Sequence, residues 1–238
     1  MDLLERVIEL RKTSPLPHFA VVDFDGSIIE NDSAEATLAY MARQKVHNAL
    51  RDFHHYYDLR DSGDLHACYR FGATTLQGLE SDLVHALVKK VVEHEGPKIT
   101  QEEFFGRTIA RGIAPRKGVI DLIARLQEQG ITVWIVTASP ELVVRAVMEC
   151  FSLKAELIGV KNILHDGMVT ADLDEPLPMF EGKVACIRKY VHATTKPLLG
   201  IGDSMNDYSM LQHSHLRAVV DRGNTLVAEA KKRGWFIL

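Results

Sequence analysis

Three short apolar segments, each ending abruptly in polar residues, limit what this chain can fold into. They are residues 18–22, 131–137 and 197–202. Short apolar runs bounded by turn residues are typical of strands buried on both faces. Amphipathic helical patterns at 119–129 and 182–191 lie between these runs along the chain. The alternation predicts an α/β fold: a doubly wound, mostly parallel, Rossmann-like sheet with helices on both faces.

The segment after the first strand has a different character, because it contains helical patterns and no convincing strand. Apolar residues recur at helical spacing over 33–50, 64–76 and 81–95. Thr100 and Glu103 have the spacing of a capping box, which predicts a fourth helix from Thr100 to Arg111. We therefore expect an all-helical cap over about residues 30–113. It is inserted into a core made of residues 1–29 and 114–238.

Two local signals predict further features of the core. Ser139 directly precedes Pro140, which predicts a helix with Ser139 as its N-cap and Pro140 at its first position. His165-Asp166-Gly167 predicts the turn of a hairpin whose flanking strands are 156–160 and 168–171.

Composition limits where the protein works and what it binds. The formal net charge is −4, from 28 Lys and Arg against 32 Asp and Glu, and the densest basic cluster is the short Lys231–Arg233. We expect no nucleic-acid partner, because such a partner requires a basic stripe. No apolar run approaches the ~18 residues of a membrane span, and the N-terminus lacks the apolar region of a secretory signal, so no membrane partner is expected. The 3 cysteines form no CxxC pair, which is typical of the cytoplasm. The sequence leaves the oligomeric state open.

Polar residues follow all three strands at the point where each strand ends. These residues are Asp23-Phe24-Asp25-Gly26-Ser27, Thr137-Ala138-Ser139 and Asp203-Ser204-Met205-Asn206-Asp207. Ligands of open parallel sheets bind beyond the carboxyl ends of the strands, so we expect these side chains to share one site. Four carboxylates at one edge repel each other unless a cation lies among them. Such oxygen ligands suit Mg²⁺, which usually keeps waters and a substrate phosphate among its ligands.

In these motifs the chain resembles the haloacid dehalogenase superfamily, and within it the phosphatases with a helical cap after the first strand. The resemblance covers about residues 18–238. Its four motifs occur in order as Asp23-x-Asp25-x-Ser27, Thr137 at a strand end, Lys183 at a helix start, and Gly202-Asp203-x-x-x-Asp207. The resemblance implies that Asp23 attacks phosphorus and forms an aspartyl-phosphate. It also implies that Asp25 protonates the leaving alcohol and then activates water.

The resemblance also assigns the remaining site residues. Thr137 and Lys183 would hold the phosphoryl oxygens. Mg²⁺ would be bound by Asp23, Asp203 and the backbone carbonyl of Asp25, with Asp207 acting through water or by orienting Lys183. The residues expected to contact the substrate are Ser27, Asp32, Ala138 and Asn206. The dehalogenases of the superfamily lack the second aspartate, so Asp25 implies phosphoryl transfer.

Two resemblances within the superfamily suggest substrates. The chain is similar to phosphoserine phosphatases in its fourth motif and at Asp32, where those enzymes carry a glutamate. Their cap arginine corresponds to Gly72, with Arg70 two residues away. The chain also resembles bacterial phosphocholine phosphatases over Asp32–Tyr40. For a quaternary ammonium group, the cap offers Asp32 and Glu35 with the aromatic residues Phe53, Tyr56, Tyr57 and Tyr69.

The function expected from the sequence is therefore a Mg²⁺-dependent phosphomonoesterase. Its partner would be a small-molecule phosphomonoester such as phosphocholine, phosphoethanolamine or phosphoserine. Two alternatives stay open. One is a phosphomutase that uses the same nucleophile and needs a bisphosphate activator, and the other is a phospho-ligand-binding protein without turnover.

Overall fold

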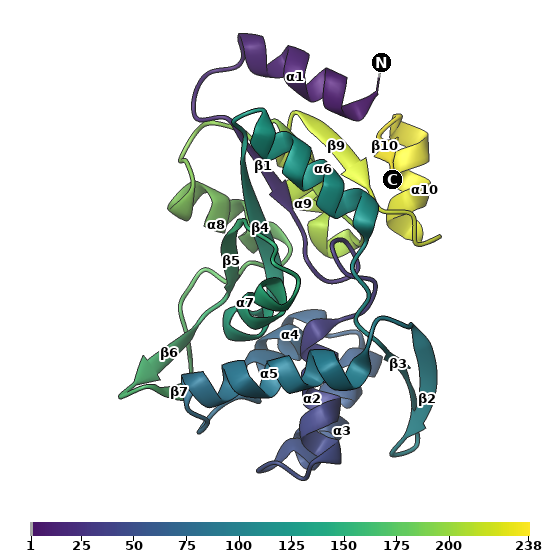
Figure 1. Cartoon of the computed structure of the whole chain (residues 1–238), viewed down its shortest axis with the longest axis vertical. Helices are drawn as coiled ribbons and strands as arrows, with labels where there is room; N and C mark the ends of the chain where they lie inside the picture. The colour runs from purple at the N-terminus through teal and green to yellow at the C-terminus, as the bar shows by residue number, and fades with distance from the viewer. Residues whose placement is uncertain (1) are drawn as a thin grey trace.

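A six-stranded parallel sheet forms the centre of the core, and β1 (Phe19–Val22) lies near its middle (Figure 1). The computed structural model describes residues 2–238. The strand order is β10-β9-β8-β1-β4-β5, and each neighbouring pair is parallel. The other five strands are β4 (Thr132–Pro140), β5 (Glu156–Val160), β8 (Leu199–Gly202), β9 (Leu216–Val219) and β10 (Phe236–Ile237). The chain leaves β1 toward β4 and β5 and later returns to β8 on its other side. This change of direction places a crevice at the carboxyl end of β1.

Helices cover both faces of the sheet, which explains why β1 is apolar at every position. The core helices are α1 (Leu3–Thr13), α6 (Lys117–Glu128), α7 (Glu141–Cys150), α8 (Glu181–Tyr190), α9 (Tyr208–His213) and α10 (Thr225–Arg233), and a 3₁₀ turn η1 (Met205–Asp207) precedes α9. Phe19 and Val21 belong to the same buried cluster as residues of α8 and α9. Ala20 and Val22 belong to a second cluster that contains residues of α1 and α6. The predicted α/β fold with a doubly wound parallel sheet is confirmed.

The cap is formed by the chain between β1 and α6 and lies beyond the carboxyl end of the sheet (Figure 1). It contains α2 (Ser33–Arg43), α3 (Ala49–Ser62), α4 (Leu65–Thr74), α5 (Ser81–Glu95) and a hairpin of β2 (Thr100–Phe104) and β3 (Arg107–Arg111). The prediction of an all-helical cap is therefore wrong at residues 100–111. Phe105 and Gly106 have φ values of 47° and 78°, so they form a two-residue turn that a helix does not allow. We retain residues 30–113 as the proposed cap boundaries.

Two other predicted elements differ from the structure. The single helix expected over 33–50 ends at Arg43, because Lys45 and His47 both have positive φ, and a separate helix, α3, follows. The hairpin at Asp166-Gly167 joins β6 (Asn162–His165) to β7 (Met168–Leu173). The expected first strand of that hairpin, 156–160, is instead the edge strand β5 of the sheet.

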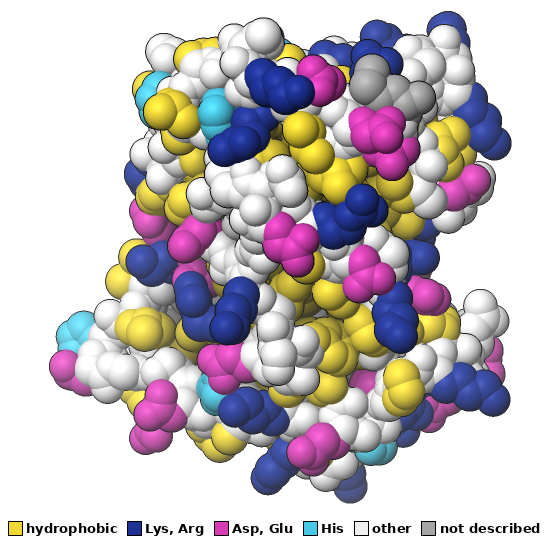
Figure 2. Space-filling view, turned by 45° about the horizontal axis from the view of Figure 1, so that its top comes forward, with side chains coloured by type: hydrophobic (Ala, Val, Ile, Leu, Met, Phe, Trp, Pro, Cys, Tyr) yellow, Lys and Arg dark blue, Asp and Glu magenta, His cyan; other side chains and the backbone are white. Residues whose placement is uncertain are grey.

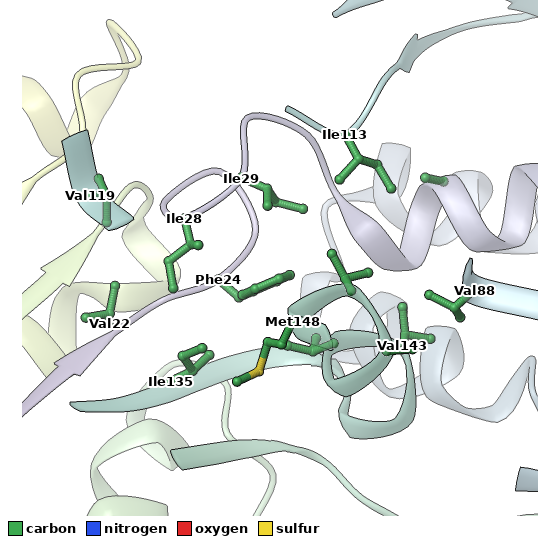
Figure 3. Close-up of a cluster of buried hydrophobic side chains, with 14 of the residues drawn as sticks. Val22, Phe24, Ile28, Ile29, Val88, Ile113, Val119, Ile135, Val143 and Met148 are labelled. Atoms are coloured by element: carbon green, nitrogen blue, oxygen red, sulfur yellow. The ribbon is translucent and has the colours of Figure 1, made fainter. Parts of the chain in front are cut away.

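Core and cap share one hydrophobic cluster. Phe24, Ile28 and Ile135 of the core belong to the same cluster as Val88 and Ile113 of the cap side, and Figure 3 shows Val88 beside Val143 of α7. The β6–β7 hairpin adds backbone hydrogen bonds to the cap, from the Gly78 amide to the Val169 carbonyl and from the Ser81 amide to the Gly167 carbonyl, both at 2.9 Å. The cap is therefore packed firmly against the core on this side.

Charged side chains of both signs are interspersed on the surface shown in Figure 2, with yellow apolar areas between them. Over residues 2–238, no helix is both long enough and apolar enough to cross a membrane.

Candidate active site

The carboxyl ends of β1, β4 and β8 bring the predicted motifs to one edge of the sheet. Asp23 directly follows β1, and its amide donates to the Ile201 carbonyl of β8 at 2.9 Å, so it continues the parallel pairing by one residue. This pairing carries Asp23 to the level of Gly202, the last residue of β8, and Asp203 follows directly. Thr137 lies within β4, the other neighbour of β1. A cavity of about 740 Å³ opens over this edge, and all three residues line it.

Lys183 lies beneath the cavity and joins two of the carboxylates. Its ammonium group donates to Asp23 Oδ1 and to Asp207 Oδ1, both at 2.6 Å, and to the Val136 carbonyl at 2.8 Å. Lys183 and Asp207 are fully buried, and Asp23 is 5% exposed. All three donor positions of the ammonium group are therefore used. The lysine predicted from the helix start is brought to the predicted nucleophile.

Burial, and then the excess of buried carboxylates over the buried ammonium group, determine the direction of the pKa shifts in this cluster. Burial, and then the charge of Asp207, raise the pKa of Asp23 well above its usual value, although Lys183 opposes this. Burial and Asp207 likewise raise the pKa of Asp203 to about 6. Burial lowers the pKa of Lys183, but the Asp207 and Asp23 carboxylates outweigh burial and raise it overall. The cluster therefore contains more negative than positive charge.

Oxygen atoms of Asp23, Asp203 and Asp207 lie within 4.8 Å of one another, and all three residues are buried. Buried carboxylates at this spacing, with an unmet need for positive charge, are the type of donor set that binds a hard divalent cation. The predicted metal-binding residues Asp23, Asp203 and Asp207 are therefore brought together. Asp207 also accepts hydrogen bonds from the amides of Asp203 and Ser204, so it holds the loop after β8 in place as well.

Arg222 is a site residue that the sequence analysis missed. It lies just beyond the carboxyl end of β9, and its guanidinium donates to Asp203 Oδ2 at 2.7 Å. Gly26 permits this approach, since a Cβ there would lie 2.2 Å from Asp203 Oδ2 and 2.4 Å from Arg222 Nη1. Gly26 also has a φ of 78°, which disfavours other residues. The strand-end rule that identified Asp23 and Asp203 could have identified Arg222 if β9 had been included.

Asp25 is held by one hydrogen bond at each carboxylate oxygen. Oδ1 accepts from the Ser33 amide at 2.6 Å, and Oδ2 accepts from the Ser139 hydroxyl at 2.5 Å. The prediction that Ser139 caps a helix is wrong. The N-cap of α7 is Pro140, and Ser139 lies at the end of β4 with its side chain bonded to Asp25. Burial raises the pKa of Asp25, and these hydrogen bonds oppose the shift.

Three of the four predicted substrate-contacting residues line the cavity, and the fourth, Ser27, does not. Asp32, Ala138 and Asn206 line the cavity. Asp32 also caps α2 by accepting from the Glu35 amide at 2.8 Å, and Asn206 Oδ1 accepts from the Phe180 amide at 2.7 Å. Ser27 is fully buried, lies 3.4 Å from Asp23 Oδ2 and is not part of the cavity wall.

The cap forms the far wall of the cavity with residues that are widely spaced in the sequence. Glu35 of α2 accepts hydrogen bonds from the hydroxyls of Tyr57 at 3.1 Å and Tyr56 at 3.3 Å, and it pairs with Arg60 of α3. Arg107 of the β2–β3 hairpin pairs with Asp58 at 2.5 Å and with Asp61. Both guanidinium groups lie near the Tyr57 ring, 5.7 Å from its centroid for Arg60 and 5.3 Å for Arg107.

Arg70, the arginine considered from the sequence, is not part of this wall. It pairs with Glu175 at 2.7 Å, and both side chains are more than half exposed. The cavity arginines are Arg60, Arg107 and Arg222. No local sequence signal could have identified Arg60 or Arg107, since their positions depend on the fold of the cap. Phe53 packs in the cap core, whereas Tyr56, Tyr57 and Tyr69 line the cavity.

Known proteins share this architecture. A protein of unknown function from Bordetella pertussis Tohama I superposes with a TM-score of 0.74 at 18% identity, over 94% of this chain and 99% of that one. A functionally unknown protein from Anaerococcus prevotii DSM 20548 also superposes with a TM-score of 0.74 at 18% identity, over 97% and 87%. A phosphoserine phosphatase, solved as a phospho-aspartyl intermediate analogue, superposes with a TM-score of 0.59 at 18% identity, over 94% and 93%. At these identities the likeness shows the fold alone.

No curated protein matches the sequence. The family model for haloacid dehalogenase-like hydrolases matches residues 20–212, which include all four predicted motifs. The chain therefore belongs to the haloacid dehalogenase-like hydrolase family.

Proposed function

We propose that the protein is a Mg²⁺-dependent phosphomonoesterase that acts through an aspartyl-phosphate. The observation that carries this proposal is the buried Asp23–Lys183–Asp207 array with Asp203 beside it, at the floor of an open cavity. Such an array presents one carboxylate to a ligand while a fixed ammonium group offsets part of its charge. The fold shared with a phosphoserine phosphatase solved as a phospho-aspartyl intermediate analogue supports the same chemistry.

In the proposed reaction, Asp23 attacks phosphorus and forms the covalent intermediate. Asp25 gives a proton to the leaving oxygen and later takes one from the water that hydrolyses the intermediate. The Thr137 hydroxyl and nearby backbone amides contact the phosphoryl oxygens, and Lys183 holds Asp23 in position. Asp23, Asp203 and the Asp25 carbonyl would hold Mg²⁺, with Asp207 supporting them. When bound, the ion supplies positive charge that offsets the charge of the phosphoryl group.

For the substrate, we propose a small phosphorylated metabolite whose leaving group carries a cationic nitrogen, such as phosphoethanolamine, phosphocholine or phosphoserine. The cap wall supports this, because its carboxylates Asp32, Glu35 and Asp61 outnumber its cations Arg60 and Arg107. Glu35 and Asp61 each pair with an arginine, whereas Asp32 pairs with none among residues 2–238. Phosphoserine would also need a cation for its carboxylate, and Arg60 and Arg107 are the cap-side candidates.

The test is phosphate release with Mg²⁺ and with EDTA. The substrates are p-nitrophenyl phosphate, phosphoserine, phosphocholine, phosphoethanolamine and sugar phosphates. We expect release only with the metal, and none from the Asp23→Asn variant, whose amide is a poor nucleophile of the same shape. The ranking of the substrates identifies the preferred leaving group. A folded wild-type protein that releases phosphate from none of these esters would contradict the proposal.

A further inference from the structure

Ser139 makes a contact that the proposed reaction does not explain. Its hydroxyl lies 2.5 Å from Asp25 Oδ2, and the side chain is buried, with 7% of the residue exposed. We infer that Ser139 is a positioning residue, which holds the Asp25 carboxyl group in the orientation that protonates the leaving alcohol. The inference rests on the proposed function and adds a residue to it.

Helix capping does not account for the serine at this position. The helix that follows, α7, begins at Glu141 with Pro140 as its N-cap, and none of the described side chains caps it. The Ser139 amide donates to Thr137 Oγ1 at 3.1 Å, so it is also directed at the site. Both polar groups of Ser139 that can donate therefore bond to residues of the cavity wall.

The two hydrogen bonds of Asp25 come from opposite sides of the active site. Ser139 belongs to the core, at the end of β4, whereas the Ser33 amide is the first of α2, in the cap. A donor at each carboxylate oxygen fixes the plane of the carboxyl group, which a single donor would leave free to rotate. A carboxylate can accept about four hydrogen bonds. The Asp25 oxygens thus keep lone pairs for the cavity, which Asp25 lines together with Asp23.

The hydroxyl group suits a proton-transfer step, because it can donate or accept a hydrogen bond by rotating. In the first half-reaction, a bond forms between Asp23 and phosphorus, and the bond between phosphorus and the ester oxygen breaks. The electron pair of the broken bond stays on the ester oxygen, which takes the proton of Asp25. Asp25 leaves this step as a carboxylate, and the Ser139 hydroxyl then donates to it. Without Ser139, Oδ2 loses the one hydrogen bond that it accepts from the described residues.

The inference predicts a defect that depends on the leaving group. An alkyl phosphate releases an alkoxide, which needs a proton during the step, whereas p-nitrophenyl phosphate releases a stable anion that does not. The value of kcat/KM reports the steps up to formation of the covalent intermediate. It therefore measures how the variant affects departure of the leaving group, separately from hydrolysis of the intermediate. We expect Ser139→Ala to lower kcat/KM for the best alkyl phosphate of the panel by about tenfold or more, which is part of the roughly 10²–10⁴-fold that general acid catalysis contributes. Its kcat/KM for p-nitrophenyl phosphate should stay within about threefold of wild type.

Three further variants separate positioning from structural damage. Ser139→Thr keeps the hydroxyl and should recover most of the alkyl phosphate activity. Ser214→Ala removes another buried serine hydroxyl, which donates to the Met210 carbonyl at 2.9 Å away from the cavity, and should leave both substrates unaffected. In an Asp25→Asn background, Ser139→Ala should cause no further loss, because the group that it positions is already absent. Circular dichroism of each variant tests whether it is folded.

The outcomes distinguish the inference from the proposed function. The wild-type protein must first hydrolyse esters. If Ser139→Ala then lowers kcat/KM equally for both substrates, or for neither, the inference is overturned and the phosphatase proposal stands. Additional loss in the Asp25→Asn background would also overturn it. If the wild-type protein hydrolyses no ester, the proposed function fails, and the role of Ser139 fails with it.

Discussion

The burial of Asp203 beside another carboxylate leads to a prediction about protein stability that can be tested without a substrate. Burial and the neighbouring Asp207 raise the pKa of Asp203 from 3.8 to about 6 in the folded protein. The folded chain therefore binds more protons than the unfolded chain between these two values. Stability from this group is complete below pH 4 and is lost as the pH rises through 6. Each pKa unit corresponds to about 1.4 kcal/mol, so the loss is about 3 kcal/mol.

The Asp203→Asn substitution removes this charge at constant shape. In EDTA, the free energy of unfolding of the variant relative to wild type should increase by about 3 kcal/mol between pH 4 and pH 7.5. For a chain of this length, 1 kcal/mol shifts Tm by about 2–4 °C, so the relative Tm should change by roughly 6–12 °C. Differential scanning calorimetry and urea titration at each pH measure this. Asp172→Asn, at an exposed position, serves as the control for removing one negative charge.

Mg²⁺ should reduce the stability advantage of Asp203→Asn over wild type at pH 7.5. A ligand at 100 times its Kd stabilises the folded state by about 2.7 kcal/mol. Wild type should gain this stability at pH 7.5, whereas Asp203→Asn lacks one of the proposed metal ligands and should gain less. The advantage of the variant should therefore shrink or reverse when EDTA is replaced by Mg²⁺. The reasoning is refuted if the difference between variant and wild type is the same at both pH values and Mg²⁺ changes neither protein.

Three further substitutions test other contacts. Lys183→Met leaves the carboxylates without their buried cation, so it should abolish activity and cost about 3–5 kcal/mol in urea unfolding; equal stability to wild type would contradict the buried array. Gly182→Ala places a Cβ 2.0 Å from the Leu177 carbonyl oxygen, so calorimetry should show a loss of about 1–3 kcal/mol, and an unchanged Tm would show that the close approach is absent. Arg70→Ala breaks only an exposed pair with Glu175, so kcat/KM should be unchanged and stability should fall by less than about 1 kcal/mol; a large loss of activity would place Arg70 in the site.

The core and its motifs could be predicted because their signals are local. A strand buried on both faces is largely apolar, and the polar residue that follows it marks the sheet edge, as at Asp23 and Asp203. Thr137 marks the same edge, although β4 continues to Pro140. The lysine was identified as part of an ordered set of motifs, although a single Lys183 at a helix start carries little information alone. Parallel pairing then brings these residues together, because it aligns the carboxyl ends of neighbouring strands.

The cap could be predicted only in part, for two physical reasons. The β2–β3 hairpin turns at Phe105-Gly106, where the first turn residue is not one of the Asn or Asp residues that usually signal such a turn. The preceding Thr100–Glu103 stretch has a capping-box spacing that suits a helix start, but in the structure it pairs with β3 as a strand. A local propensity was thus overridden by pairing with a neighbouring segment.

Two carboxyl groups of the cap wall, Glu35 and Asp32, differ in how fully the protein already satisfies them. Glu35 satisfies two tyrosine hydroxyls and one guanidinium, and these contacts keep its carboxylate oriented without any ligand. A leaving group that binds there must replace existing hydrogen bonds, and their loss offsets what it gains. Among residues 2–238, Asp32 accepts one hydrogen bond, from the Glu35 amide, so a second group can bind its carboxyl group without replacing an existing contact. The cap wall should therefore discriminate mainly through Asp32, and an amine on the leaving group should raise kcat/KM more than added bulk does.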